Sequence, residues 1–171
     1  MWLKQHQIES ETAVRAPAEL VWQHATEVDI ASFEHPAYLA LLDIPKPLRA
    51  EITRAGVGGR RVAFFANGRT FTQTITTWQP HTQYEFTFQA SPNFRVGYLL
   101  DLADGPFQMK SGSYRIVPQG EGVQLFLAST YQLRGFWGYC LALPVRLVLN
   151  VFQRYLLRGI RANAEREAGD A

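Results

Sequence analysis

The chain has 171 residues, of which 47% are apolar and 19% are charged, a composition typical of a globular protein and not of a disordered one. Its net charge of +2 is spread without a basic run, so the charge pattern of a DNA- or RNA-binding protein is absent and we expect no nucleic-acid partner. The length predicts a single domain over residues 1–171 with a core of its own.

The N-terminal third predicts one strand followed by two helical stretches. Residues 6–16 alternate apolar or small side chains with charged ones, which is the period of a half-exposed strand. Pro17 ends this strand and suits the first turn of a helix over residues 17–28. A second helical or irregular stretch covers residues 29–44 and is broken at Pro36.

The middle of the chain predicts a run of antiparallel strands. Asn67–Gly68 is a strong hairpin signal because both positions favour the positive φ of a type I′ turn. Residues 91–107 are less regular, and either a short strand or a loop ending near Asp104 fits them. The predicted strands in this region cover residues 48–55, 60–66, 69–78, 84–90, 110–118 and 123–133.

The most apolar run of the chain, Phe136 to Leu157, lies near the C-terminus. It is close to the shortest length that spans a bilayer, but Arg146 inside it would cost about 2.5–3.5 kcal/mol at a helix centre. Polar residues recur at every fourth position and form one stripe, which predicts a mostly buried helix that is polar along one side: Arg146, Asn150, Arg154 and Arg158. Pro144 either begins this helix or kinks it.

Grouped strands with helices at both ends indicate an α+β protein whose helices lie on one side of an antiparallel sheet. The N-terminus lacks the apolar core of a signal peptide, and the single cysteine, Cys140, excludes an intramolecular disulfide. We therefore expect a cytoplasmic protein.

Three segments, residues 8–28, 67–88 and 112–133, resemble the START-like, polyketide-cyclase and lipid-transport superfamily (SRPBCC), whose helix-grip fold is shared with the major birch pollen allergen. In residues 8–28, Val14, Ala16–Pro17 and Val21–Trp22 match the apolar-x-Ala-Pro-x-x-x-Val-Trp pattern at the end of the family's first strand. Residues 67–88 and 112–133 match its later hairpins. The resemblance implies a curved seven-stranded antiparallel sheet wrapped around a long C-terminal helix, two short helices after the first strand, and a cavity between sheet and helix.

The function that this resemblance implies first is binding or transport of a hydrophobic or amphipathic small molecule such as a lipid or polyketide. Polar side chains that face inward in an apolar cavity orient a ligand, while aromatic and aliphatic ones bury it. The expected cavity residues are Phe71, Gln73, Ile75, Tyr84, Phe86, Phe88, Tyr114, Leu127, Ser129 and Tyr131 on the strands, and Leu147, Val151 and Tyr155 on the helix. Loops near 33–40 and 92–106 and the start of the helix are expected to surround the entrance.

An enzyme on the same fold, an aromatase/cyclase or dehydratase, is the alternative. Such catalysis uses cavity shape with one or two acid–base groups, for which the candidates are Arg154, Tyr131, Tyr114 and His35. The four histidines show no metal spacing, so neither a metal nor a cofactor is expected.

A third hypothesis is weak docking on a membrane surface or a partner through Phe136, Trp137 and Tyr139, with Arg134 and Arg146 nearby. The sequence carries no signal for an oligomeric state.

Overall fold

A computed structural model describes residues 3–90, 95–96, 100–101 and 105–171. Seven strands form one antiparallel sheet in the order β1-β9-β8-β5-β4-β3-β2, and β6 pairs with β7 separately. The expected architecture, a seven-stranded sheet with a long C-terminal helix and two short helices after the first strand, is confirmed. The strands of the large sheet are β1 (Leu3–Val14), β2 (Pro47–Ile52), β3 (Arg60–Phe65), β4 (Thr70–Gln79), β5 (Gln83–Ala90), β8 (Phe107–Gln119) and β9 (Gly122–Arg134).

The short elements lie where breaker residues predict them. Helix α1 (Ala18–Thr26) begins directly after Pro17, and α2 (Ala37–Leu41) begins directly after Pro36. The hairpin turn between β3 and β4 is confirmed at Asn67–Gly68, but its predicted type I′ is wrong: Gly68 has a φ of +77°, whereas Asn67 does not have the positive φ that this type also needs. The irregular stretch 91–107 contributes the short strands β6 (Arg95–Val96) and β7 (Leu100–Asp101), while much of the loop expected at 92–106 lies outside the described residues.

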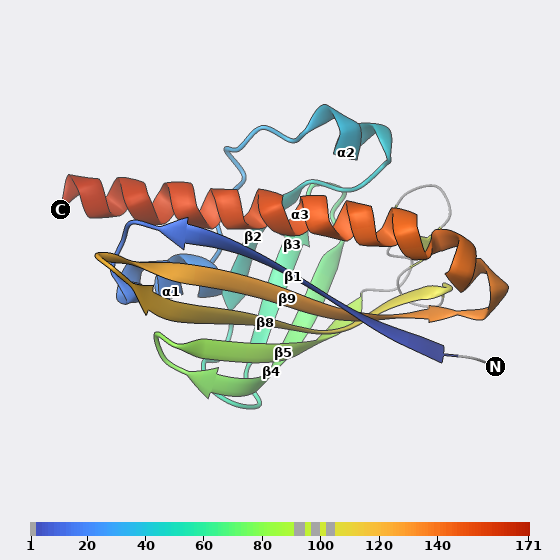
Figure 1. Ribbon diagram of the computed structural model, residues 1–171, viewed down its shortest axis with the longest axis horizontal. Helices are drawn as coiled ribbons and strands as arrows, with labels where there is room; N and C mark the ends of the chain where they lie inside the picture. The colour runs from blue at the N-terminus through green and yellow to red at the C-terminus, as the bar shows by residue number, and fades with distance from the viewer. Residues whose placement is uncertain (1–2, 91–94, 97–99, 102–104) are drawn as a thin grey trace.

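Helix α3 (Gly135–Asp170) crosses one face of the sheet and packs chiefly against β1, β9 and α1. Figure 1 shows this long helix lying over the strands, with its N-terminal part bent away from the axis of the remainder. It is one continuous helix that contains Pro144, so this proline does not begin it. By length and composition alone, the part Cys140–Asp170 is also long and apolar enough to span a membrane, a property that the core helices of soluble proteins share.

The predicted polar stripe faces outward, but the exposed face of α3 is wider than expected. Arg146, Arg154 and Arg158 are exposed and Asn150 is half-buried. Leu143 and Leu147, which the helical pattern placed on the buried surface, are 66% and 59% exposed. The prediction of a mostly buried helix is therefore wrong in its first half, where apolar residues outside the polar stripe are exposed as well.

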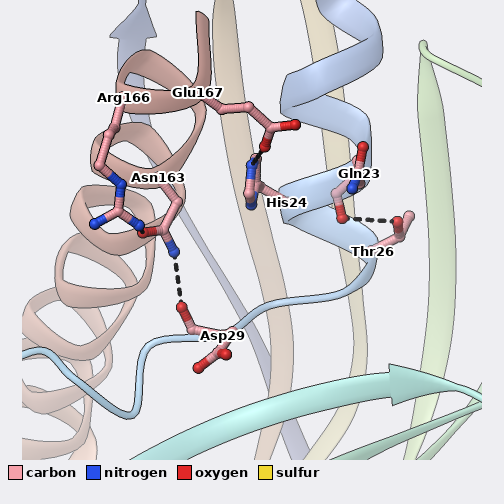
Figure 2. A network of polar contacts seen from close by, with 7 residues as sticks. All are labelled: Gln23, His24, Thr26, Asp29, Asn163, Arg166 and Glu167. Atoms are coloured by element: carbon pink, nitrogen blue, oxygen red, sulfur yellow. Dashed lines mark hydrogen bonds and ion pairs between the residues drawn. The ribbon is translucent and has the colours of Figure 1, made fainter. Parts of the chain in front are cut away.

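Polar contacts fasten the C-terminal half of α3 to α1 and to the chain that follows α1 (Figure 2). The His24 imidazole lies 2.7 Å from the Glu167 carboxylate, and the Asn163 amide donates to the Asp29 carbonyl at 2.7 Å. Arg166 donates to the Asn163 side-chain oxygen at 3.1 Å. These bonds join α3 to α1 and to the following chain at the end of α3 opposite to its bend.

Two tyrosines buried in the main hydrophobic core, Tyr84 and Tyr155, differ in their hydrogen bonding. The Tyr84 hydroxyl donates to the Ala25 carbonyl at 2.7 Å, whereas the buried Tyr155 hydroxyl finds no hydrogen-bond partner among the described residues. Tyr84→Phe is therefore expected to lower the free energy of unfolding by about 1 kcal/mol, the net value of one hydrogen bond. Tyr155→Phe is expected to be neutral or stabilising, because it removes a buried hydroxyl that has lost its water.

Urea denaturation of both variants beside the wild type measures this difference. The two substitutions remove the same atom from buried rings, so each is the control for the other. Equal losses of stability, or a larger loss for Tyr155→Phe, would contradict the assignment.

Candidate ligand-binding site

A cavity of about 340 Å³ lies between the sheet and α3. This volume falls within the range of roughly 300–1,000 Å³ found for small-molecule sites. Its wall is formed by β2, β3, β4, β5, β8 and β9, by the chain on either side of α2, and by the N-terminal half of α3. Six phenylalanines dominate the lining: Phe65, Phe71, Phe86, Phe88, Phe107 and Phe152.

Local sheet geometry brings these rings to one face. Gly112 lies opposite Phe86 in the pairing of β5 with β8, and a Cβ at this position would lie only 2.8 Å from the Phe86 ring. The absence of a side chain at Gly112 thus makes room for the ring. A bulge between Met109 and Ser111 shifts the alternation of β8, so that both Met109 and Tyr114 reach the cavity.

The structure brings together seven of the predicted cavity residues at this wall: Phe71, Gln73, Phe86, Phe88, Tyr114, Leu127 and Ser129. Three other predicted strand residues are buried elsewhere in the core. Ile75 and Tyr84 are almost fully buried, with Tyr84 in the aromatic and aliphatic core beneath α1, and Tyr131 stacks on His6 with ring centroids 5.2 Å apart. These three side chains do not line the cavity.

The helical part of the prediction is displaced. Leu147, Val151 and Tyr155 do not line the cavity, and Tyr155 packs edge-on against His35 at a centroid distance of 6.4 Å. Successive residues of a helix point about 100° apart, so an error of one position moves the predicted face by more than a quarter turn. The helix residues at the wall are Leu141, Pro144, Val145, Val148, Leu149, Phe152, Gln153 and Leu156.

Arg61 is the buried charge at this wall. Its side chain is 3% exposed, and Nε donates to the Thr26 carbonyl at 2.7 Å while Nη2 donates to the Ala25 carbonyl at 3.2 Å. Both carbonyls belong to the last turn of α1, the negative end of the helix dipole. Nη1 donates to the Gln73 side-chain oxygen at 2.7 Å.

Burial raises the pKa of the Tyr114 hydroxyl, and the nearby Arg61 guanidinium opposes this shift only in part. The pKa of Tyr84 is raised for the same reason. Both phenols are therefore protonated at neutral pH and able to donate hydrogen bonds, and the only one of the two at the cavity wall is Tyr114.

The second buried polar side chain at the wall is Gln153, which connects α3 to the neighbouring strands β1 and β9. Gln153 is 2% exposed; its amide nitrogen donates to the Ser129 hydroxyl at 2.9 Å, and its oxygen accepts from the Ser10 hydroxyl at 2.8 Å. The same nitrogen lies 3.4 Å from the Ile8 carbonyl. Gln153 therefore both lines the cavity and holds α3 on the sheet.

The family model for polyketide cyclase / dehydrase and lipid transport matches residues 5–166. The chain belongs to this family. No curated protein matches the sequence of this family member.

Solved structures share the fold of this polyketide cyclase / dehydrase and lipid-transport family member at low sequence identity. Ara h 8.0201 is 17% identical, with a TM-score of 0.60 over 98% of this chain and 100% of its own. TTHA0849 from Thermus thermophilus is 19% identical, with a TM-score of 0.62 over 95% and 99%. A truncated norcoclaurine synthase from Thalictrum flavum is 16% identical, with a TM-score of 0.55 over 94% and 92%. These likenesses establish the helix-grip fold and nothing finer.

The four catalytic candidates do not meet in this family member. Arg154 is exposed, Tyr131 lies outside the cavity, and the His35 ring nitrogen Nε2 lies 3.0 Å from the Ile44 carbonyl. Tyr114 is the one candidate at the wall. Among the described residues, no three His, Cys, Asp or Glu side chains gather in a geometry that could hold a metal.

Two polar residues of the cavity wall, Arg61 and Gln153, are absent from the set that the sequence predicts. A signal for Arg61 was present, because Arg61, Ala63 and Phe65 alternate along β3 and therefore share one face. Gln153 had a weaker signal, a polar residue one position before the outward stripe at Arg154.

Proposed function

We propose that this protein binds a hydrophobic or amphipathic small molecule, such as a lipid or a polyketide, in the cavity beneath α3. The observation that carries the proposal is a volume of about 340 Å³ whose wall is almost entirely aromatic and aliphatic. Removing apolar surface from water contributes on the order of 25 cal/mol per Å², before the cost of association is subtracted. Five polar side chains at the wall would set the orientation of the ligand: Arg61, Gln73, Tyr114, Ser129 and Gln153. Arg49 lies at the exposed rim, where its side chain is already paired with Glu51.

Adjacent residues of α3 offer a matched test of this proposal. Val148 lines the cavity and is half-buried, whereas Leu147 does not line it and is 59% exposed. Val148→Trp is expected to weaken binding of the neutral probe N-phenyl-1-naphthylamine at least tenfold, because the indole occupies the space that the probe needs. Leu147→Trp adds the same indole to the outer face and is expected to leave affinity within twofold.

Probe fluorescence, excited outside the tryptophan band, measures both affinities, and thermal unfolding verifies that the variants are folded. No binding by the wild type, or equal affinities for the two variants, would refute the proposal.

Catalysis of cyclisation or dehydration is less well supported. It needs an acid–base group with an activating neighbour in the cavity, and of the four candidates this leaves Tyr114. Burial moves the Tyr114 pKa further above neutrality, the wrong direction for a base at pH 7. We therefore favour binding over turnover.

A cytoplasmic, single-domain protein accords with the packing of α3 on the sheet and with the exposed single thiol of Cys140. Membrane-surface docking rests on Phe136, which is 76% exposed, since the side chains of Trp137 and Tyr139 lie outside the described residues. A single exposed aromatic side chain is common on protein surfaces, so it supports membrane docking less than the cavity supports ligand binding.

A further inference from the structure

The cavity wall holds a buried cation, the guanidinium of Arg61, that no carboxylate of the described residues neutralises. Within the described part of the chain, no Asp or Glu oxygen forms an ion pair with Arg61. Its three hydrogen-bond acceptors are neutral oxygens: the carbonyls of Ala25 and Thr26 and the amide oxygen of Gln73. A buried charge with neutral partners alone is costly to keep, and it attracts an anion strongly.

The donors around Arg61 are not exhausted. A guanidinium carries five N–H groups, and three of them are used, so one N–H remains on each terminal nitrogen. Gln73 accepts through its oxygen, and its amide nitrogen adds N–H donors at the same place on the wall. The protonated Tyr114 hydroxyl, close enough to feel the charge of Arg61, adds another donor.

The rest of the wall does not compensate this charge. The described residues that line the cavity include two arginines and no acidic side chain. Arg49 stands at the rim, where its side chain is 53% exposed and pairs with Glu51 at 2.6 Å. Arg61 is thus the cation that faces the cavity interior without an acidic partner among the described residues.

We propose that the cavity selects amphipathic carboxylic acids, whose carboxylate meets Arg61 while the apolar chain or ring system lies against the phenylalanines. Two N–H groups on neighbouring nitrogens can serve both oxygens of a carboxylate. A neutral alcohol of the same size gains the apolar burial but leaves the charge of Arg61 uncompensated. This inference rests on the proposed function and narrows its ligand class.

Matched pairs of acid and alcohol test the selection: decanoate against 1-decanol, and 2-naphthoate against 2-naphthalenemethanol. Displacement of N-phenyl-1-naphthylamine from the wild type at pH 8 gives the affinities. Each acid is expected to bind at least tenfold more tightly than its alcohol. This comparison uses the wild type alone, so it remains decisive if an Arg61 variant fails to fold.

Arg61→Met is expected to weaken both acids at least tenfold and to leave both alcohols within threefold. Arg49→Met is the control, an arginine of the same wall that is exposed and already paired, and it is expected to keep the preference within twofold. Equal displacement by acids and alcohols, or loss of the preference in Arg49→Met alone, would overturn the inference while leaving the proposed function standing. Failure of the wild type to bind the probe would instead remove the proposed function itself.

Discussion

Replacing Gln153 by methionine is expected to lower the free energy of unfolding by about 2–3 kcal/mol, although the side chain keeps nearly its length and shape. The amide of Gln153 is the only described partner of the Ser10 hydroxyl and bonds the Ser129 hydroxyl as well. Methionine removes both bonds and leaves two buried hydroxyls without partners, which costs more than the bonds themselves contribute. The loss also loosens α3 where it meets β1 and β9, the two strands on which it packs.

Urea denaturation measures the loss of unfolding free energy, and two further variants serve as controls for its cause. Arg154→Met, at the exposed neighbouring position, is expected to change stability by less than about 0.5 kcal/mol. The triple variant Ser10→Ala/Ser129→Ala/Gln153→Met is expected to recover most of the loss, because it removes the unsatisfied hydroxyls together with the amide. A triple variant less stable than Gln153→Met would show that the hydroxyls have other partners and that this account is wrong.

The strands were predictable because one buried face of a sheet imposes a period of two, and glycine and proline mark the turns between strands. Phe71 and Gln73 show this well: they alternate with threonines along β4, and both lie at the cavity wall. The resemblance at Ala16–Pro17 and Val21–Trp22 supplied the topology, which periodicity alone does not determine.

The face of α3 was not predictable in the same way. Apolar residues surround most of its first half, so the pattern indicates which side is polar but not which apolar side meets the cavity. Leu147 and Val148 are equally apolar neighbours, yet the cavity lies beside Val148 and Leu147 faces outward. Only the docking of the helix on the sheet separates them.

Arg61 was missed for a different physical reason. A charged residue is rarely buried, so alternation that places an arginine on the inner face of a strand is normally discounted. Here the last turn of α1 supplies two carbonyl acceptors, and these come from residues 35 and 36 positions away in the sequence. No local pattern contains that information.

Trp22 packs α1 against β4 and β5, and its replacement by alanine is expected to cost about 3–5 kcal/mol of unfolding free energy. Trp22 is 8% exposed and meets Trp78 and Tyr84 edge-on at centroid distances of 4.8 and 5.5 Å. Removing the indole deletes these contacts and leaves a void that the rigid sheet cannot close. Since Ala25 and Thr26 hold the Arg61 guanidinium, the same change is expected to weaken the acid preference of the cavity.

Urea denaturation of Trp22→Ala beside Gln23→Ala separates the loss of packing from any change in helix propensity. Gln23 is the exposed neighbour of Trp22 in the same helix, and its replacement is expected to cost less than about 0.5 kcal/mol. Native-state hydrogen exchange gives the local consequence: the amides of α1 are expected to exchange faster in Trp22→Ala, while those of β9 change only with global stability. A loss of unfolding free energy below about 1 kcal/mol would contradict the role of Trp22, because removing a well-packed indole costs more than this. Unchanged hydrogen exchange in α1 would show that Trp22 does not hold this helix in place. The effect of Trp22 on the position of the Arg61 guanidinium would then be refuted.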